Sequence, residues 1–245
     1  MALYRYVKVE RISKPPNPTL VRASKTLPFF LIAVGLFLVA NAAWPIISYE
    51  LVTSFRFQKK LIRPVPQQVI TRPSGQNQVL GQEAQEVDYT KPSNWFPSAP
   101  KLPPQPSKIT HYTLSIPKLE INQAIVEIGG EDLQQALIHY PGTALPGQYG
   151  NVVIFGHSVL PQFFNPENYK TIFSTLPTLE EEDEIFIDYD GITYRYVVNQ
   201  MVEVGPADIS VLEQWYDSEY LSLITCVPPG TYLKRLIVRG KLVEI

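Results

Sequence analysis

The sequence predicts an all-β domain over residues 108–245, with short helices between some strands and one apolar helix before the domain. Three observations predict this fold class. An uninterrupted apolar run lies near the N-terminus, seven short runs beyond residue 108 are rich in β-branched and aromatic residues, and turn-forming pairs such as Asp190-Gly191 separate those runs. Seven or more strands at this spacing are typical of a closed barrel or a sandwich.

The N-terminal part divides into a basic tail over residues 1–26 and a transmembrane anchor over residues 27–48. The stretch from Thr26 to Tyr49 carries no charge, and a spanning helix needs roughly 20 apolar residues. Six Lys and Arg residues precede it, which favours a cytoplasmic N-terminus and an extracellular remainder. A cleaved signal peptide is the alternative, because Ala40-Asn41-Ala42 has the small-x-small form of a cleavage site.

Residues 49–107 are predicted to form an extracellular spacer. Nine prolines lie among polar residues in 64–107, a composition typical of a semi-rigid, extended chain. Trp95 and Phe96 stand out in this stretch. They are either an incidental exposed pair or an aromatic anchor that docks the spacer on the domain as a lid over a cleft.

The strand prediction beyond residue 108 rests on short runs that are rich in β-branched and aromatic residues. The predicted strands are 111–116, 124–128, 151–155, 184–189, 193–204, 221–226 and 233–245. Short helices fit between them at 131–138, 168–175 and 208–216.

Charge is distributed unevenly between the two parts of the chain. Residues 1–107 hold 13 Lys+Arg and 5 Asp+Glu, a balance of +8, whereas residues 108–245 hold 8 and 18, a balance of −10. An acidic domain repels phosphate backbones, so nucleic acid is excluded as the expected partner. The basic part suits an anionic membrane surface.

The sequence predicts no cofactor. With one cysteine and three histidines, the usual Cys/His zinc sites are excluded by number, and no internal disulfide can form. The acidic run over 180–184 is the one candidate for calcium, although consecutive like charges are more typical of a solvated turn.

Three residues at strand ends carry the candidate chemistry. His157 follows the run 151–155, Cys226 ends the run 221–226, and Arg235 begins the next run. If the last two runs pair as a hairpin, Cys226 faces Arg235, at a Cβ separation of about 5 Å. A guanidinium at that range lowers the pKa of a thiol and stabilises charge that develops on a substrate oxygen. Thr225 and Ser158, next to this set, are expected to bind the substrate.

These segments, in this order, resemble the sortase family. The resemblance rests on IHYPGT at 138–143, Gly156-His157, LITCVPPG at 223–230 and KRLIV at 234–238, and it covers roughly residues 110–245. It implies an eight-stranded β-barrel and a cysteine transpeptidase. It also implies Cys226 as the nucleophile on a Leu-Pro-x-Thr-Gly-like sorting signal, His157 as the acid and base, and Arg235 as the residue that positions the substrate and supports the oxyanion.

The implied partners are surface proteins with a C-terminal sorting signal and an amine from peptidoglycan or a pilin lysine. Two other functions stay open. An exported cysteine peptidase would use the same Cys/His pair, although papain-type chains place the cysteine before the histidine. A non-enzymatic surface-binding module would instead bury Cys226 as a small apolar side chain.

Overall fold

The computed structural model describes residues 18–57, 88–99 and 108–244. A long helix, α1 (Pro18–Ser48), contains the predicted anchor and continues into a π-helical turn (Tyr49–Thr53) and a 3-10 turn (Ser54–Arg56). The helical stretch Leu27–Arg56, which includes these two turns, is long and apolar enough to cross a membrane, and none of its most apolar part is buried. Its length and composition fit a membrane anchor. The chain divides into two compact units, one that ends at Trp44 and one that begins at Pro45.

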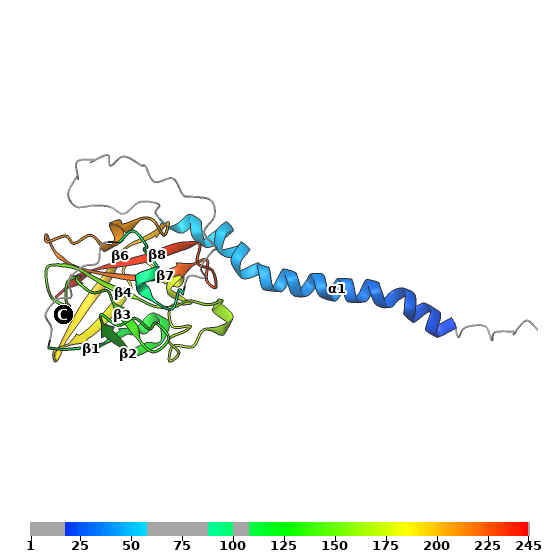
Figure 1. Cartoon of the computed structure of the whole chain (residues 1–245), viewed down its shortest axis with the longest axis horizontal. Coiled ribbons are helices and arrows are strands. Elements are labelled where there is room, and N and C mark those ends of the chain that lie inside the picture. The colour runs from blue at the N-terminus through cyan, green and yellow to red at the C-terminus, as the bar shows by residue number, and fades with distance from the viewer. Residues whose placement is uncertain (1–17, 58–87, 100–107, 245) are drawn as a thin grey trace, which may run out of the picture. The chain divides into compact units, whose positions relative to one another are not determined.

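Eight strands close into a barrel, so the predicted fold class is confirmed (Figure 1). Around the barrel the order is β1-β2-β3-β4-β7-β8-β6-β5. The strands are β1 (His111–Ile116), β2 (Ile121–Ile128), β3 (Leu137–His139), β4 (Gly150–Phe155), β5 (Glu184–Tyr189), β6 (Ile192–Val204), β7 (Glu219–Val227) and β8 (Lys234–Val243).

The short helices differ from their predicted positions. Turns and strand β3 occupy 131–138, and turns occupy 168–175, so both predicted helices are wrong there. Within 208–216 a single 3-10 turn forms, capped by the Asp208 side chain. The described 3-10 turns beyond the anchor are Pro92–Asn94, Pro117–Leu119, Pro161–Phe163, Leu176–Thr178 and Ile209–Leu212.

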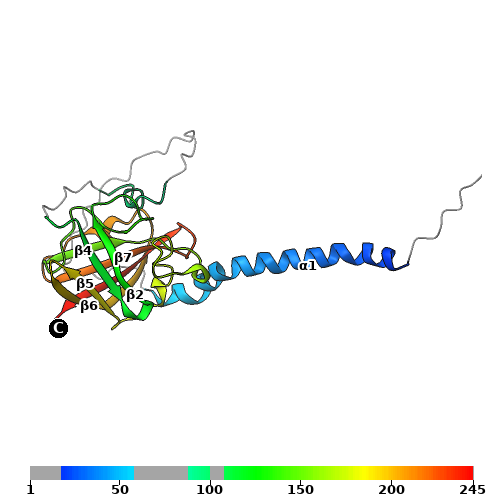
Figure 2. The same ribbon diagram turned by 90° about the horizontal axis from the view of Figure 1, so that it is seen from below.

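The directions of neighbouring strands determine which strand ends lie at the same edge of the sheet. Most neighbours are antiparallel, but β2 pairs with β3, and β4 with β7, in parallel. Figure 2 shows β4 and β7 side by side. Parallel strands end at the same edge of a sheet. The residues that follow Phe155, the last residue of β4, therefore lie beside the end of β7.

The β7–β8 hairpin has the predicted register. Cys226 lies opposite Arg235, Ile224 opposite Ile237, and Ser222 opposite Arg239. The turn between the strands needs Gly230, which has a φ of +82° and leaves a Cβ little room beside Leu160. The hairpin is therefore fixed by both its turn and its strand pattern.

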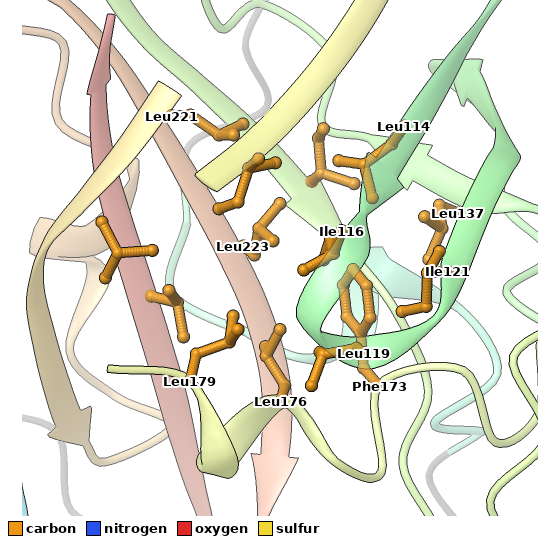
Figure 3. Packing of buried hydrophobic residues seen from close by; sticks show 14 of the residues in the cluster. Leu114, Ile116, Leu119, Ile121, Leu137, Phe173, Leu176, Leu179, Leu221 and Leu223 are labelled. Carbon is orange, nitrogen blue, oxygen red and sulfur yellow. The ribbon is translucent and has the colours of Figure 1, made fainter. Parts of the chain in front are cut away.

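The buried apolar side chains form two clusters on opposite faces of the sheet. The first draws on all eight strands and so fills the interior of the barrel, as Figure 3 shows for Leu114, Leu137 and Leu223. The second draws only on β3, β4, β6, β7 and β8, and therefore lies on the outer face of those strands. Ile224, Cys226 and Ile237 belong to this outer cluster.

Side chains from the predicted spacer join both clusters. Tyr49 and Phe57 belong to the interior cluster, and the Tyr49 hydroxyl donates to Glu203 on β6 over 2.6 Å. Trp95 and Phe96 belong to the outer cluster. The domain boundary at residue 108 stays a prediction, but the barrel uses these upstream residues as core.

Candidate active site

Cys226 lies at the outer face of the barrel, near the end of β7, and only 1% of its surface is exposed. Burial raises the pKa of this thiol from its ordinary value of 9.0 to about 12, and the nearby charge of Arg235 opposes that shift. The sequence predicted a lowered pKa. The guanidinium does act in that direction, but the loss of solvent outweighs it.

Arg235 is buried beside the thiol and makes three hydrogen bonds to carbonyl oxygens. One terminal nitrogen donates to the carbonyls of Tyr232 and Lys234 at 3.0 and 3.1 Å, and the other donates to the carbonyl of Trp95 at 3.2 Å. Its Cζ atom also lies 5.4 Å from the Trp95 ring centre and 5.9 Å from that of Tyr89. The guanidinium is thus held rigidly, partly by residues outside the barrel strands.

His157 follows the end of β4, as the sequence predicted, and the parallel pairing of β4 with β7, which was not predicted, places it at the edge where β7 ends. The centre of its imidazole ring lies 6.1 Å from the ring centre of Trp95. Within the described part of the chain its Nε2 atom has no hydrogen-bond partner. Burial lowers the pKa of His157, while the charges of Asp132 and Asp88 oppose this shift. A neutral imidazole with a free nitrogen is suited to accept or deliver a proton.

The segment over residues 88–99 contacts His157 and Arg235 and shares the outer cluster with Cys226. Trp95 has no exposed surface, lies against both His157 and Arg235, and donates from its indole nitrogen to the carbonyl of Tyr89 at 2.8 Å. Phe96 packs beside Phe155, at a ring distance of 6.1 Å. The interpretation of Trp95 and Phe96 as an incidental exposed pair is therefore wrong, since both are docked on the outer cluster.

Thr225 and Ser158 use their hydroxyls within the protein. The Thr225 hydroxyl donates to the carbonyl of Gly156 at 2.8 Å, and the Ser158 hydroxyl donates to the carbonyl of Cys226 at 2.7 Å. Both side chains are buried. Their contact with substrate stays a prediction, and in this structure they join the two segments that carry His157 and Cys226.

A second buried arginine lies away from the site. Arg239 lies opposite Ser222, and its Cζ atom is 4.0 Å from the ring centre of Trp215. Burial lowers the pKa of Arg239 to about 9. Since Arg239 is four residues beyond Arg235, the two side chains lie about 13 Å apart along the strand.

Acidic residues of the run over 180–184 form ion pairs with basic side chains. Glu180 pairs with Arg56 and Lys118, and Asp183 also pairs with Lys118. Within the described ranges no group of three His, Cys, Asp or Glu side chains is placed to hold a metal ion. The absence of a cofactor remains an expectation.

Some residues of the site were not found by sequence reasoning. Tyr89 stacks on Tyr232 at a ring distance of 4.2 Å and faces Arg235, while Asp88 and Asp132 act on His157 through their charge. These residues carry no motif. The aromatic residues in an otherwise polar, proline-rich stretch were the one available signal.

The comparisons with known proteins agree with this geometry. A profile of the sortase domain matches residues 114–243. The chain is similar to Sortase D of Bacillus subtilis, with 27% identity over 89% of this chain and 98% of the relative. It is also similar to Sortase A of Bacillus anthracis, with 26% identity over 66% of this chain and 78% of the relative.

Among solved structures, sortase C-1 from Actinomyces oris superimposes with a TM-score of 0.51 at 26% identity, covering 60% of this chain and 89% of that one. The profile spans more than half of the 245 residues, and the barrel has the same fold. The chain belongs to the sortase family, whose members are cysteine transpeptidases.

Proposed function

We propose that this transpeptidase cleaves a Leu-Pro-x-Thr-Gly-like sorting signal through Cys226. One observation carries the proposal: the only cysteine lies directly opposite a buried arginine, at the edge where the strand before His157 also ends. In the first half-reaction the Cys226 sulfur forms a bond to the threonyl carbonyl carbon. The bond from that carbon to the following nitrogen breaks, which leaves a thioacyl enzyme and a free amine.

His157 moves the protons in this scheme. It takes the thiol proton and delivers it to the leaving amine. When the incoming amine attacks the thioacyl carbon, His157 takes a proton from that amine, the bond from the carbon to sulfur breaks, and the proton returns to Cys226. The free Nε2 atom and the pKa lowered by burial support this role, because a neutral imidazole is ready to accept a proton.

Arg235 stabilises the tetrahedral intermediates. A guanidinium donates hydrogen bonds to the oxygen that becomes negative, and in a site without water each such bond is worth more. Tyr232 and Lys234 hold one terminal nitrogen in place through their carbonyls. The other terminal nitrogen donates to Trp95, and Nε has no partner within the described residues, so a substrate oxygen would accept from these two donors.

Residues 88–99 act as a lid in this proposal. Trp95 occupies the space over Arg235 and His157, so a peptide can reach Cys226 only after the segment moves away. Trp95 contacts Arg235 through its ring and through the hydrogen bond that the guanidinium donates to its carbonyl. Opening therefore exposes apolar surface and frees one hydrogen-bond donor of Arg235.

The partners follow from the family chemistry. The donors are surface proteins with a C-terminal sorting signal, and the acceptor is an amine of peptidoglycan or of a pilin lysine. The apolar helix holds the protein in the cell membrane with its N-terminus in the cytoplasm, and the barrel lies outside.

The test uses the full-length protein in detergent micelles. Sorting-signal peptides are incubated with cross-bridge and lysine peptides, and products are identified by mass spectrometry. We expect a thioacyl adduct on Cys226 and new amide products, both lost in Cys226→Ala. Cleavage without transfer to any amine would favour an exported cysteine peptidase, and neither reaction would favour a binding module.

A further inference from the structure

Two buried hydroxyls join the segment of His157 to the strand of Cys226 in a reciprocal arrangement. Thr225, on the strand, donates to the carbonyl of Gly156, which precedes His157. Ser158, which follows His157, donates to the carbonyl of Cys226. His157 thus lies between the acceptor Gly156 and the donor Ser158, and on β7 the donor Thr225 directly precedes Cys226, whose own carbonyl is the acceptor.

The two hydrogen bonds extend the β4–β7 ladder beyond its end. The last paired residues are Phe155 and Ile224, and the Gly156 amide still donates to the carbonyl of Ile224 at 3.1 Å. Past this point the chain of His157 turns away from the strand. Since a buried carbonyl needs a donor, the hydroxyls of Ser158 and Thr225 supply what the backbone no longer provides.

The other side of the His157 segment is also fixed. The Phe173 amide donates to the carbonyl of His157 at 3.0 Å, and the Val159 amide donates to the Ser174 hydroxyl at 2.9 Å. A Cβ atom on Gly156 would overlap the Phe173 ring, so the backbone there is packed closely. Against this rigid support, the two hydroxyls are the side-chain contacts that set the distance from His157 to β7.

We propose that Ser158 and Thr225 are positioning residues that hold the His157 imidazole at the height of the Cys226 sulfur. This inference rests on the proposed function, in which these two groups exchange a proton. Proton transfer and attack need reacting atoms about 3–3.5 Å apart, and a misplacement of about 1 Å lowers the rate by about 100-fold. Neither hydroxyl needs to touch the substrate for this role.

The experiment compares four variants of the full-length protein in micelles. Ser158→Ala and Thr225→Val each remove one hydroxyl, and Ser158→Thr keeps it. Ser222→Ala is the matched control, because Ser222 is buried on the same strand and donates to Asn151 over 2.8 Å. Transfer kinetics and melting temperature are measured for each, together with the pH titration of the His157 imidazole by NMR.

We expect Ser158→Ala and Thr225→Val to lower kcat by about 10- to 100-fold with KM nearly unchanged, and to move the His157 titration. Ser158→Thr should recover most of kcat. Ser222→Ala should melt at a similarly lowered temperature but keep its kcat and its His157 titration. Equal losses of kcat in Ser158→Ala and Ser222→Ala, or a loss confined to KM, would overturn the positioning role.

Failure of the proposed function gives a different result. In that case the unmodified protein forms no thioacyl adduct, and kinetics of the variants carry no information about positioning. The NMR titration remains informative about positioning. A change in the His157 titration in Ser158→Ala but not in Ser222→Ala supports the positioning role without any turnover. An unchanged titration in both would overturn it.

Discussion

Removing the Trp95 side chain should make the Cys226 thiol far more reactive. Burial under the outer cluster, to which Trp95 belongs, raises the pKa of Cys226 to about 12, while Arg235 acts to lower it. In Trp95→Ala the segment 88–99 loses its ring contacts with His157 and Arg235, so water should reach the sulfur while the favourable charge of Arg235 remains. The pKa should then fall toward its ordinary value of 9.0 or below.

The magnitude follows from the fraction of thiolate. At pH 8 a thiol with a pKa near 12 is ionised in about one molecule in 10⁴, and a thiol with a pKa near 9 in about one in ten. The ceiling on the increase in alkylation rate is therefore about 10³-fold, and a partly opened lid should still give more than about tenfold. The rate should level off near pH 9 in the variant, whereas in the unmodified protein it should still be rising at pH 10.

The assay is alkylation by iodoacetamide from pH 6 to pH 10, followed by intact-protein mass spectrometry. Trp215→Ala is the matched control, since Trp215 stacks on Arg239 instead of Arg235. Near-UV circular dichroism and melting curves separate lid opening from unfolding. If folded Trp95→Ala reacts no faster than the unmodified protein, or no faster than Trp215→Ala, the segment does not control access to the thiol.

Three further predictions concern charge and processing. Arg235→Ala should lower kcat by about 10²–10³-fold, as expected for one lost oxyanion donor, while Arg239→Ala should change it far less; a larger loss in folded Arg239→Ala would contradict the assignment. Asp132→Asn removes a charge that favours the imidazolium, so the pKa of His157 should fall further and the acid limb of the pH–rate profile should move to lower pH, checked by NMR titration and by kinetics. N-terminal sequencing of protein from membranes should find the uncleaved chain, whereas a mature chain that begins at Ala43 would show that the apolar run is a signal peptide.

Much of the barrel could be predicted because its strands are short runs rich in β-branched and aromatic residues, with turn signals between them. The runs that became β1 and β5 were predicted with their observed ends, and the register of β7 against β8 followed from the length of the turn alone. Strand β3 was missed for a physical reason. It is three residues long, and Leu133, Ala136 and Leu137 before and within it are spaced as in a helix, although two face the outer cluster and one faces the interior.

The environment of the site could not be predicted in the same way. Cys226 and Arg235 were placed by local pairing, but the outer cluster in which the thiol is buried also includes Trp95, 131 residues earlier in the sequence. No periodicity or turn signal in the sequence predicts that Trp95 packs in the outer cluster. For the same reason the core role of Tyr49 and Phe57 was not predicted, and a protein that begins at residue 108 should melt at a lower temperature than one that begins at residue 45.

The parallel pairing of β4 and β7 has a consequence for how such enzymes can diversify. Their neighbouring ends bring His157 and Cys226 together, yet 63 residues separate Phe155 from Glu219 along the chain. That excursion includes the loops beside the outer face, among them the one with Trp215. Insertions and substitutions in those loops leave the pairing of β4 with β7 intact, so the segment of His157 stays beside the end of the strand that carries Cys226.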